Sequence, residues 1–310
     1  MSNQINKNNT AVLVFGELST TLLTATEQKN DNKNRTKIFS STQDMPAVFF
    51  DTQSITSSTG NNQTSFGISD NGTGANQEVG MQLMKDKIDQ VLELQVNDKK
   101  LVDFQTYLIQ VCIGGGTAGS AFELGHKLNE LGKKVIFFCY DLMTSDVTDG
   151  DRLTNATHAK KQLTHFSHTY LTRQSGNLLD IANTSNSSIE LVKTLFAFRN
   201  ADNNDLTKLF SSNTEFQLKV GSMTTNSKSS ETLADKVIVN SLKSQALKFV
   251  NESGTVSNLL VCASTPCGEA NNAKDLKNAF NPYFVENPTI KTAIGFASES
   301  TSTFIIVVAK

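Results

Sequence analysis

The chain has 310 residues, and its 28 basic and 30 acidic residues leave a formal net charge of −2. This length suffices for one large domain or two ordinary ones, and the near-neutral charge gives no electrostatic footprint for a nucleic acid or an anionic membrane. The longest apolar runs are far shorter than the roughly 20 residues that a membrane helix needs, and the four cysteines are too few for a disulfide framework. We therefore expect a cytoplasmic protein with no membrane segment and no nucleic-acid partner.

The first half of the chain alternates short apolar runs with helical patterns. Residues 1–10 are polar, which excludes a signal peptide and predicts a disordered tail. Short apolar runs bounded by polar residues or glycine, as buried parallel strands are, occupy residues 11–16, 47–51, 107–113 and 134–140. Segments dense in Asn, Ser and Thr, at residues 29–36 and 54–71, are predicted to be exposed loops.

Two helices are predicted among these strands. Residues 78–94 carry apolar side chains at spacings of three and four, and a second helix spans residues 118–131 and stops at Gly132, a C-cap signal. The alternation of strands and helices predicts a parallel sheet with helices on both faces.

The second half has a different order of elements. Strands are expected at residues 215–222, 257–264, 292–297 and 303–309, with helices near 187–198, 231–242 and 271–280. Two adjacent strands at the end favour a smaller mixed sheet. With a boundary at the polar run RNADNND, the predicted domains are residues 11–199 and 200–310.

The run GGGTAGS, residues 114–120, follows an apolar strand and opens a helix, although glycine in regular structure costs about 0.5–1 kcal/mol relative to alanine. A tight turn is the simplest explanation. A dinucleotide loop of an NAD-dependent oxidoreductase is another, but that fingerprint belongs in the first βα unit, where this chain has only Gly16. The third is a phosphate loop, because glycines let N–H groups face an anion and Thr117 and Ser120 add hydroxyl donors at a helix N-terminus.

Four segments resemble, in the same order, motifs of the tubulin/FtsZ superfamily. GGGTAGS resembles the phosphate loop GGGTGSG, and NGTGANQEVG at residues 71–80 resembles the FtsZ segment GAGANPEVG, whose loop meets the terminal phosphate. NADNNDL at residues 200–206 resembles NxDFADV, the loop that reaches the neighbouring subunit's nucleotide, and residues 220–242 resemble the IGSA stretch and the helix after it. The segment FASES also lies near the position of the family's VIDES. The chain thus resembles a divergent FtsZ-like protein from residue 11 to residue 310.

This resemblance implies a Rossmann-like parallel-sheet GTPase domain joined by a central helix to a smaller α+β domain with a mixed sheet. It implies GTP or GDP as the cofactor, with Mg²⁺ carried by the nucleotide and no metal site of the protein's own. The nucleotide-binding residues that it implies are Gly16, Gly72, Thr73, Gly74, Ala75, Asn76, Gly114, Gly115, Gly116, Thr117, Ala118, Gly119, Ser120, Asp149 and Arg152.

The resemblance also implies catalysis between two subunits. Asp202 and Asp205, with Asn200 beside them, are expected to position the attacking water against the next subunit's nucleotide. Such a head-to-tail interface does not close and generates a filament, of the kind that serves cell division. The partner is a second copy or an active FtsZ relative. A role for Asp202 as the N-cap of the following helix is the alternative that the residues leave open.

The first phosphate loop departs from the family. The family has several glycines there, roughly GGAGGNAV, whereas this chain has FGELSTTLL and keeps only Gly16. We expect Glu17 to bring negative charge close to a polyphosphate. Bulky residues in this loop, and Ala118 in place of a glycine, are expected to be strained at positive φ, by about 1–2 kcal/mol each. An alternative function is therefore a nucleotide-independent or hydrolysis-deficient paralogue that polymerises or caps filaments.

Two other features carry weaker expectations. His158, His165 and His168 have no acidic or thiolate neighbour at ligand spacing, so we expect no metal site there. The chain ends directly after its last predicted strand, without the linker and terminal peptide of a division FtsZ, so membrane attachment through a tail is not expected.

Overall fold

Continuous apolar runs favour strands that are buried on both faces, and in the computed structural model these runs pair as a parallel sheet. The structure describes residues 9–19, 45–52, 63–69, 71–142, 146, 148–167, 169–172, 181, 185, 216–219, 258–265, 289–296 and 304–309. The chain divides into two units, Ile5–Ile189 and Glu190–Lys310 together with Met1–Gln4.

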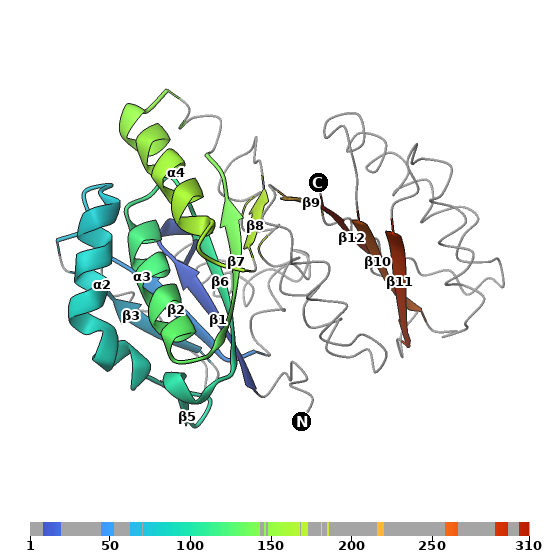
Figure 1. Ribbon diagram of the computed structural model, residues 1–310. Helices are drawn as coiled ribbons and strands as arrows, with labels where there is room; N and C mark the ends of the chain where they lie inside the picture. The colour runs from blue at the N-terminus through green and yellow to red at the C-terminus, as the bar shows by residue number, and fades with distance from the viewer. Residues whose placement is uncertain are drawn as a thin grey trace, which may run out of the picture. The chain divides into compact units, whose positions relative to one another are not determined.

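The sheet of the first unit has six strands, and every pairing in it is parallel (Figure 1). In order across the sheet they are β3 (Gln63–Gly67), β2 (Ala47–Asp51), β1 (Thr10–Phe15), β6 (Thr106–Cys112), β7 (Lys134–Tyr140) and β8 (Thr169–Thr172). The four predicted strands occupy the four central positions, which confirms a parallel α/β sheet. The chain changes winding direction between β1 and β6, and in doubly wound sheets ligands bind outside the carboxyl ends of the strands at that point.

Strand β3 corrects the sequence analysis, which assigned residues 54–71 to an exposed loop. Gln63–Gly67 pair in parallel with β2 at the edge of the sheet. The segment QTSFG buries only Phe66, and its composition is polar because an edge strand has little surface to bury. Pairing with β2, rather than an intrinsic preference for strand, stabilises this element.

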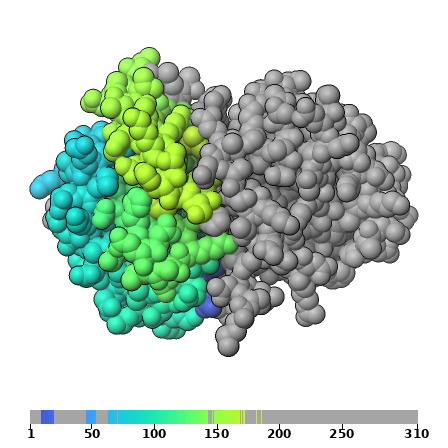
Figure 2. Space-filling view, in the orientation of Figure 1, coloured from blue at the N-terminus to red at the C-terminus, as the bar shows by residue number. Residues whose placement is uncertain are grey.

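Three helices lie side by side on one face of the sheet, α2 (Gln77–Leu92), α3 (Thr117–Glu130) and α4 (Gly150–Leu163) (Figure 1). The central helix α3 packs on β1, β6 and β7, and the outer surfaces of the helices form much of the coloured part of Figure 2. Both predicted helices are confirmed, and Gly132 follows α3 with a φ of 72°, as a C-cap glycine does. Between α2 and β6 lie a short hairpin, β4 (Gln95–Val96) and β5 (Lys99–Lys100), and a 3-10 turn, Leu101–Asp103.

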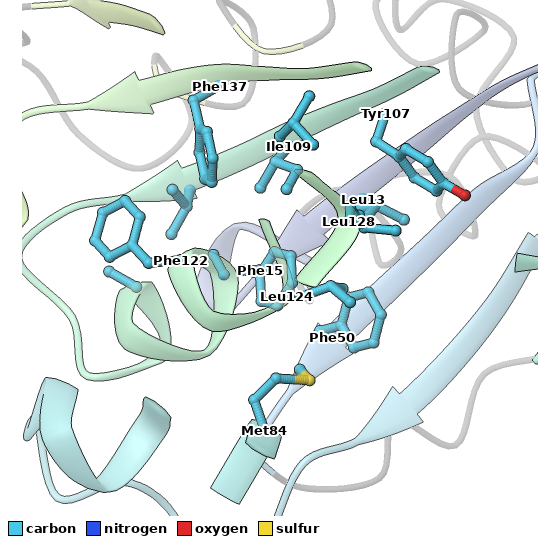
Figure 3. Close-up of a cluster of buried hydrophobic side chains, with 14 of the residues drawn as sticks. Leu13, Phe15, Phe50, Met84, Tyr107, Ile109, Phe122, Leu124, Leu128 and Phe137 are labelled. Atoms are coloured by element: carbon cyan, nitrogen blue, oxygen red, sulfur yellow. The ribbon is translucent and has the colours of Figure 1, made fainter. Parts of the chain in front are cut away.

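The core between the sheet and the helices is rich in aromatic side chains (Figure 3). Phe15 and Phe50, on neighbouring strands, stack with ring centroids 4.5 Å apart, and Phe137 packs against Phe122 of α3 at 5.5 Å. The alternate side chains of the same strands, such as Val14, are equally buried. Both faces of the sheet are therefore covered, and α2, α3 and α4 account for one of them.

The second unit contains a four-stranded mixed sheet. Its strands, in order, are β11 (Thr289–Phe296), β10 (Asn258–Thr265), β12 (Phe304–Ala309) and β9 (Phe216–Lys219). The pair β10–β11 is parallel, whereas β10–β12 and β12–β9 are antiparallel. The prediction of a smaller mixed sheet is confirmed. The predicted helices near residues 187–198, 231–242 and 271–280, and the acidic loop with Asn200, Asp202 and Asp205, lie outside the described residues.

Candidate functional site

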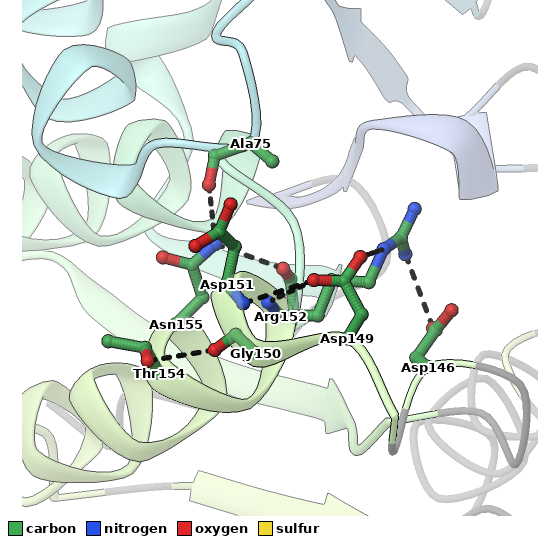
Figure 4. Close-up of polar contacts among 9 residues, drawn as sticks. Ala75, Asp146, Asp149, Gly150, Asp151, Arg152, Thr154 and Asn155 are labelled. Carbon is green, nitrogen blue, oxygen red and sulfur yellow. Dashed lines mark hydrogen bonds and ion pairs between the residues drawn. The ribbon is translucent and has the colours of Figure 1, made fainter.

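The helices α2, α3 and α4 all begin near the carboxyl edge of the sheet, and their leading loops touch one another. Asn155 on α4 donates hydrogen bonds to the carbonyl oxygen of Ala75, in the loop before α2, and to that of Gly114, in the loop before α3 (Figure 4). A side chain on Gly116 would overlap the hydroxyl of Thr73. The two loops that were predicted to meet phosphate are therefore brought together by the fold.

A pocket of about 90 Å³ opens beside the glycine loop. Backbone from the end of β6 and the start of α3 forms one wall, with Gly114, Gly115 and Thr117. Its charged lining residues are Glu17, Asp141, Asp146 and Arg152. The pocket lies at the point where the winding of the sheet reverses.

Several glycines at this edge are required by helix packing. A Cβ on Gly119 would overlap the backbone oxygen of Gln77, and one on Gly80 would overlap that of Gly116. The hydroxyl of Ser120 donates to the Gly80 carbonyl at 2.7 Å. Gly119 and Ser120, which were predicted to bind nucleotide, therefore hold the N-terminal halves of α2 and α3 close together.

Gly115 is different, because protein packing does not require its lack of a side chain. The nearest atom to a Cβ at this position would be the Thr117 hydroxyl at 3.7 Å, an ordinary contact. The helix that follows is also uncapped: α2 and α4 have their first N–H groups bound by the side chains of Asn76 and Asp149, whereas α3, with Gly116 at its N-cap, has no side-chain cap. In the first turn of α3 the N–H groups of Ala118 and Gly119 bond the carbonyl oxygens of Gly115 and Gly116 instead. The N–H groups left for an anion are those of the preceding loop and of Thr117, at the positive end of the helix.

The first loop turns more tightly than the sequence predicted. Gly16 has a φ of 73°, and a helical turn begins directly at Glu17. Among the described residues, the non-glycine residues with positive φ are Ala75, Asn97 and Asp98. The expected strain at Glu17 and Ala118 was therefore wrong, because Gly16 is the only left-handed residue in the described part of the first loop, residues 15–19, and Ala118 lies inside α3, where it is fully buried.

Arg152 is held by two carboxylates at the start of α4 (Figure 4). Its Nη1 lies 3.2 Å from Asp146 Oδ2, and its Nε lies 3.7 Å from Asp149 Oδ2. Asp149 also caps α4 by accepting hydrogen bonds from the N–H groups of Asp151 and Arg152. Of these two residues, both expected to bind nucleotide, Arg152 lines the pocket, and Asp149 positions both the helix and the guanidinium.

The remaining charges make the pocket acidic. Glu17, Asp141 and Asp146 supply three carboxylates, against the single guanidinium among the described lining residues. Burial raises the pKa of the Cys112 thiol, which also lines the pocket, to about 12, and the nearby carboxylates of Glu17 and Asp146 add to this rise in pKa. The thiol is therefore neutral at physiological pH and adds no negative charge of its own.

Two residues at the site were not predicted. Asn155 and Gln77 donate side-chain hydrogen bonds to the glycine loop. Gln77 stands where the FtsZ segment GAGANPEVG has proline. This departure from the motif could have indicated that Gln77 has a role of its own at the site. Asn155 gave no signal, because its role depends on how α4 lies against two loops that are distant in sequence.

The described residues contain no group of three or more His, Cys, Asp or Glu side chains arranged to hold a metal. In the same part of the chain, no helix is long and apolar enough to cross a membrane.

The fold and the site together define a class of protein, in which a Rossmann-like sheet carries three helix-leading loops at its switch point and is accompanied by a mixed-sheet unit. This chain shares that fold with solved structures of FtsZ, CetZ and TubZ. An FtsZ mutant from M. jannaschii matches 97% of this chain and 91% of its own, with a TM-score of 0.65 and 15% identity. CetZ2 from Haloferax volcanii, in a GTPγS-bound protofilament, matches 96% of this chain and 92% of its own, with a TM-score of 0.65 and 15% identity.

TubZ from Clostridium botulinum phage c-st is similar over 98% of this chain and 92% of its own, with a TM-score of 0.57 and 14% identity. No protein-family model and no curated protein matches the sequence. The similarity is thus in the fold, at an identity at which sequence comparison no longer detects it.

Proposed function

We propose that this chain binds GTP or GDP at the carboxyl edge of its six-stranded sheet and assembles head to tail into filaments. The observation that carries this proposal is the uncapped N-terminus of α3, preceded by Gly115 at the pocket wall. Backbone N–H groups and the positive end of a helix are suited to phosphate. CetZ1 and CetZ2 from Haloferax volcanii, which share the fold, are described as GDP-bound and as a GTPγS-bound protofilament.

Each part of the site has a role in this proposal. The loop from Gly114 to Thr117 holds phosphate, with Mg²⁺ accompanying the nucleotide, and Arg152 offers positive charge to the rest of the ligand. Bound GTP supplies the γ-phosphate, and Asp202 and Asp205 of the neighbouring copy, with Asn200, position the water that attacks it. Because each site is completed by the next copy, the contact is heterologous and propagates as a filament.

A second candidate function is a paralogue that polymerises without nucleotide, or that caps the filament of an active relative without hydrolysing nucleotide. The lining of the pocket favours it. Arg152 pairs with Asp146 and Lys160 pairs with Asp141, but the three carboxylates of Glu17, Asp141 and Asp146 outnumber these two cations, and the excess negative charge repels a polyphosphate. In a cap, the acidic loop would engage the partner's nucleotide while the chain's own pocket stays a poor site.

The nucleotide content of the freshly purified protein, measured by acid release and chromatography, distinguishes the GTP-dependent filament from the nucleotide-independent or capping paralogue. Bound GDP or GTP, together with light scattering that rises on addition of GTP, supports the first function. A nucleotide-free protein whose scattering does not depend on GTP contradicts it and supports the second. The scattering is repeated with ATP as the control for the base.

A further inference from the structure

Four successive carbonyl groups in the glycine loop each accept a hydrogen bond from the protein. In chain order, Ile113 O accepts from Gln77 Nε2 at 2.8 Å, Gly114 O from Asn155 Nδ2 at 3.2 Å, Gly115 O from Ala118 N at 3.2 Å, and Gly116 O from Gly119 N at 3.1 Å. Gln77 Nε2 also lies 3.4 Å from Gly115 O. Two side-chain amides, one on α2 and one on α4, thus bind the part of the loop that precedes the helix.

The orientation of these carbonyls fixes the orientation of the N–H groups. The described peptides are all trans, and in a trans peptide the C=O and the following N–H point in opposite directions. The N–H groups of Gly114, Gly115, Gly116 and Thr117 therefore point away from the donors that bind the carbonyls. None of the four donates to a residue that the structure describes, and three of these four residues line the pocket.

Gln77 is a residue that packing alone does not explain. Its side chain is only 3% exposed, and its Oε1 has no partner in the described part of the chain. A buried carbonyl oxygen without a donor destabilises a fold. The carboxamide is retained at this place because its Nε2 holds the carbonyl of Ile113, at the entry to the glycine loop.

Asn155 uses both hydrogens of its Nδ2 group (Figure 4). Besides Gly114, it binds the carbonyl of Ala75, a non-glycine residue with a φ of 57°. Such a left-handed residue persists only where its surroundings hold it. Asn155 therefore holds both loops at one fixed separation.

We propose that Gln77 and Asn155 are positioning residues, which turn the glycine loop so that its N–H groups face the phosphate groups of the ligand. The identity of that ligand as a guanine nucleotide rests on the proposed function. The orientation of the loop does not, because backbone N–H groups turned toward a phosphate would bind any phosphate anion. Inorganic pyrophosphate is therefore a probe that separates the two proposals.

The test is a titration of the ¹⁵N-labelled full chain with pyrophosphate, GDP and guanosine, followed through the amide resonances of Gly114 to Thr117. In the unmodified chain, pyrophosphate and GDP should shift these resonances. Asn155→Ala and Gln77→Met should weaken the binding of both anions about tenfold, the effect of losing roughly one charge-assisted hydrogen bond. Guanosine, which has no phosphate, should bind the variants as it binds the unmodified chain.

Matched controls change neighbouring side chains on the same helices. Thr157→Ala on α4 and Gln82→Met on α2 alter exposed residues that do not touch the loop, and both should bind pyrophosphate normally. If Asn155→Ala does not fold, Asn155→Leu keeps a side chain of similar size and removes both donors without adding a charge, and it should show the same loss.

The outcomes distinguish the two proposals. Loop amides that shift with pyrophosphate, and lose affinity in the variants, support the positioning role even if GTP neither binds nor drives assembly. Loop amides that do not respond to pyrophosphate overturn it. Variants that bind the anions as well as the controls do, or that lose guanosine to the same extent, also overturn it, although GTP-dependent assembly would then still stand.

Discussion

The glycines at the start of α3 differ in whether the packing of the protein requires them to lack a side chain. Gly119 is required by the backbone of α2, because a Cβ there would overlap the Gln77 carbonyl, whereas a Cβ on Gly115 would meet nothing closer than 3.7 Å. Residues in one short motif therefore separate into a packing group and a ligand group. Substitution at each position measures the two roles independently.

Gly119→Ala should destabilise the fold, and Gly115→Ala should not. Backbone atoms cannot move aside as a flexible side chain can, so we expect Gly119→Ala to lower the free energy of unfolding by about 2–3 kcal/mol. The matched Gly115→Ala should unfold like the unmodified chain but bind GDP more weakly. Urea unfolding and a GDP titration measure the two effects, and equal stability of the two variants would contradict the assignment.

Glu17→Gln should strengthen the binding of nucleotide. Glu17 lines the same pocket as Gly115, and removing its charge relieves repulsion of a polyphosphate by about 1 kcal/mol, or roughly a fivefold fall in the GDP dissociation constant. Glu130→Gln, at the opposite end of α3, is the control and should have no effect. A weaker affinity for GDP in the Glu17 variant would mean that this carboxylate contacts the ligand favourably.

Cys112 should react slowly with alkylating agents in the folded protein. In the folded chain the pKa of the Cys112 thiol is raised to about 12, so the folded state favours the neutral thiol. The neutral thiol therefore adds to the free energy of unfolding below the unfolded thiol pKa of about 8.5, and this stabilisation is lost as the pH rises toward 12. At pH 8 we expect iodoacetamide to modify Cys112 at least about a hundredfold more slowly than in the urea-unfolded chain. Peptide mapping by mass spectrometry follows the rate, and a plateau in that rate near pH 9 would contradict the raised pKa.

At the scale of single elements, the N-termini of the three helices differ in whether a side chain caps them. The side chains of Asn76 and Asp149 satisfy the first N–H groups of α2 and α4, while those of α3 remain without a cap. In α3 the N–H groups of Ala118 and Gly119 bond backbone carbonyls of the glycine loop, and the N–H groups of that loop are left for a ligand. The same Asp149 carboxylate holds Arg152, so helix capping and the charge of the pocket depend on one residue.

Asp149→Ala should destabilise α4 through loss of its N-cap. The expected decrease in the free energy of unfolding is about 1 kcal/mol, measured by urea unfolding. Asp151→Ala, in the first turn of the same helix, loses only an interaction with the helix dipole and should cost less, about 0.3–1 kcal/mol. If the two variants were equally stable, the capping bonds would contribute nothing measurable.

The elements differ in how well the sequence predicted them. Strands β1, β2, β6 and β7 were found because they consist mainly of consecutive apolar residues, which is the pattern of strands buried on both faces. Strand β3 was missed because its residues are polar and its strand conformation depends on pairing with β2. At the site, the glycine loop had a motif to identify it, whereas the contacts of Asn155 involve loops 41 and 80 residues away and leave no local pattern.

At the scale of the whole molecule, the proposed filament places half of the chemistry on the neighbouring copy. Asp202→Ala should leave GTP binding and GTP-dependent scattering intact, because the chain's own pocket is unchanged. It should slow phosphate release about a hundredfold or more, the usual contribution of a group that positions or activates an attacking water. Asn203→Ala, the next residue along, is the control and should hydrolyse GTP at the normal rate. Normal hydrolysis by the Asp202 variant would leave that residue only the helix-capping role.

The sequence by itself determined the parallel sheet, the two helices that flank its first crossovers, the mixed second sheet and the position of the glycine loop. These features depend on local periodicity and on apolar runs, which a sequence records directly. Only the tertiary structure decided which glycines are required by packing and that Gly115, at the pocket wall, is not, and that α3 alone among the three helices lacks a side-chain cap. Only the tertiary structure, too, brought Gln77 and Asn155 to the carbonyls of the glycine loop. Those properties depend on distances between residues far apart in the chain, and these distances exist only after the helices have packed on the sheet.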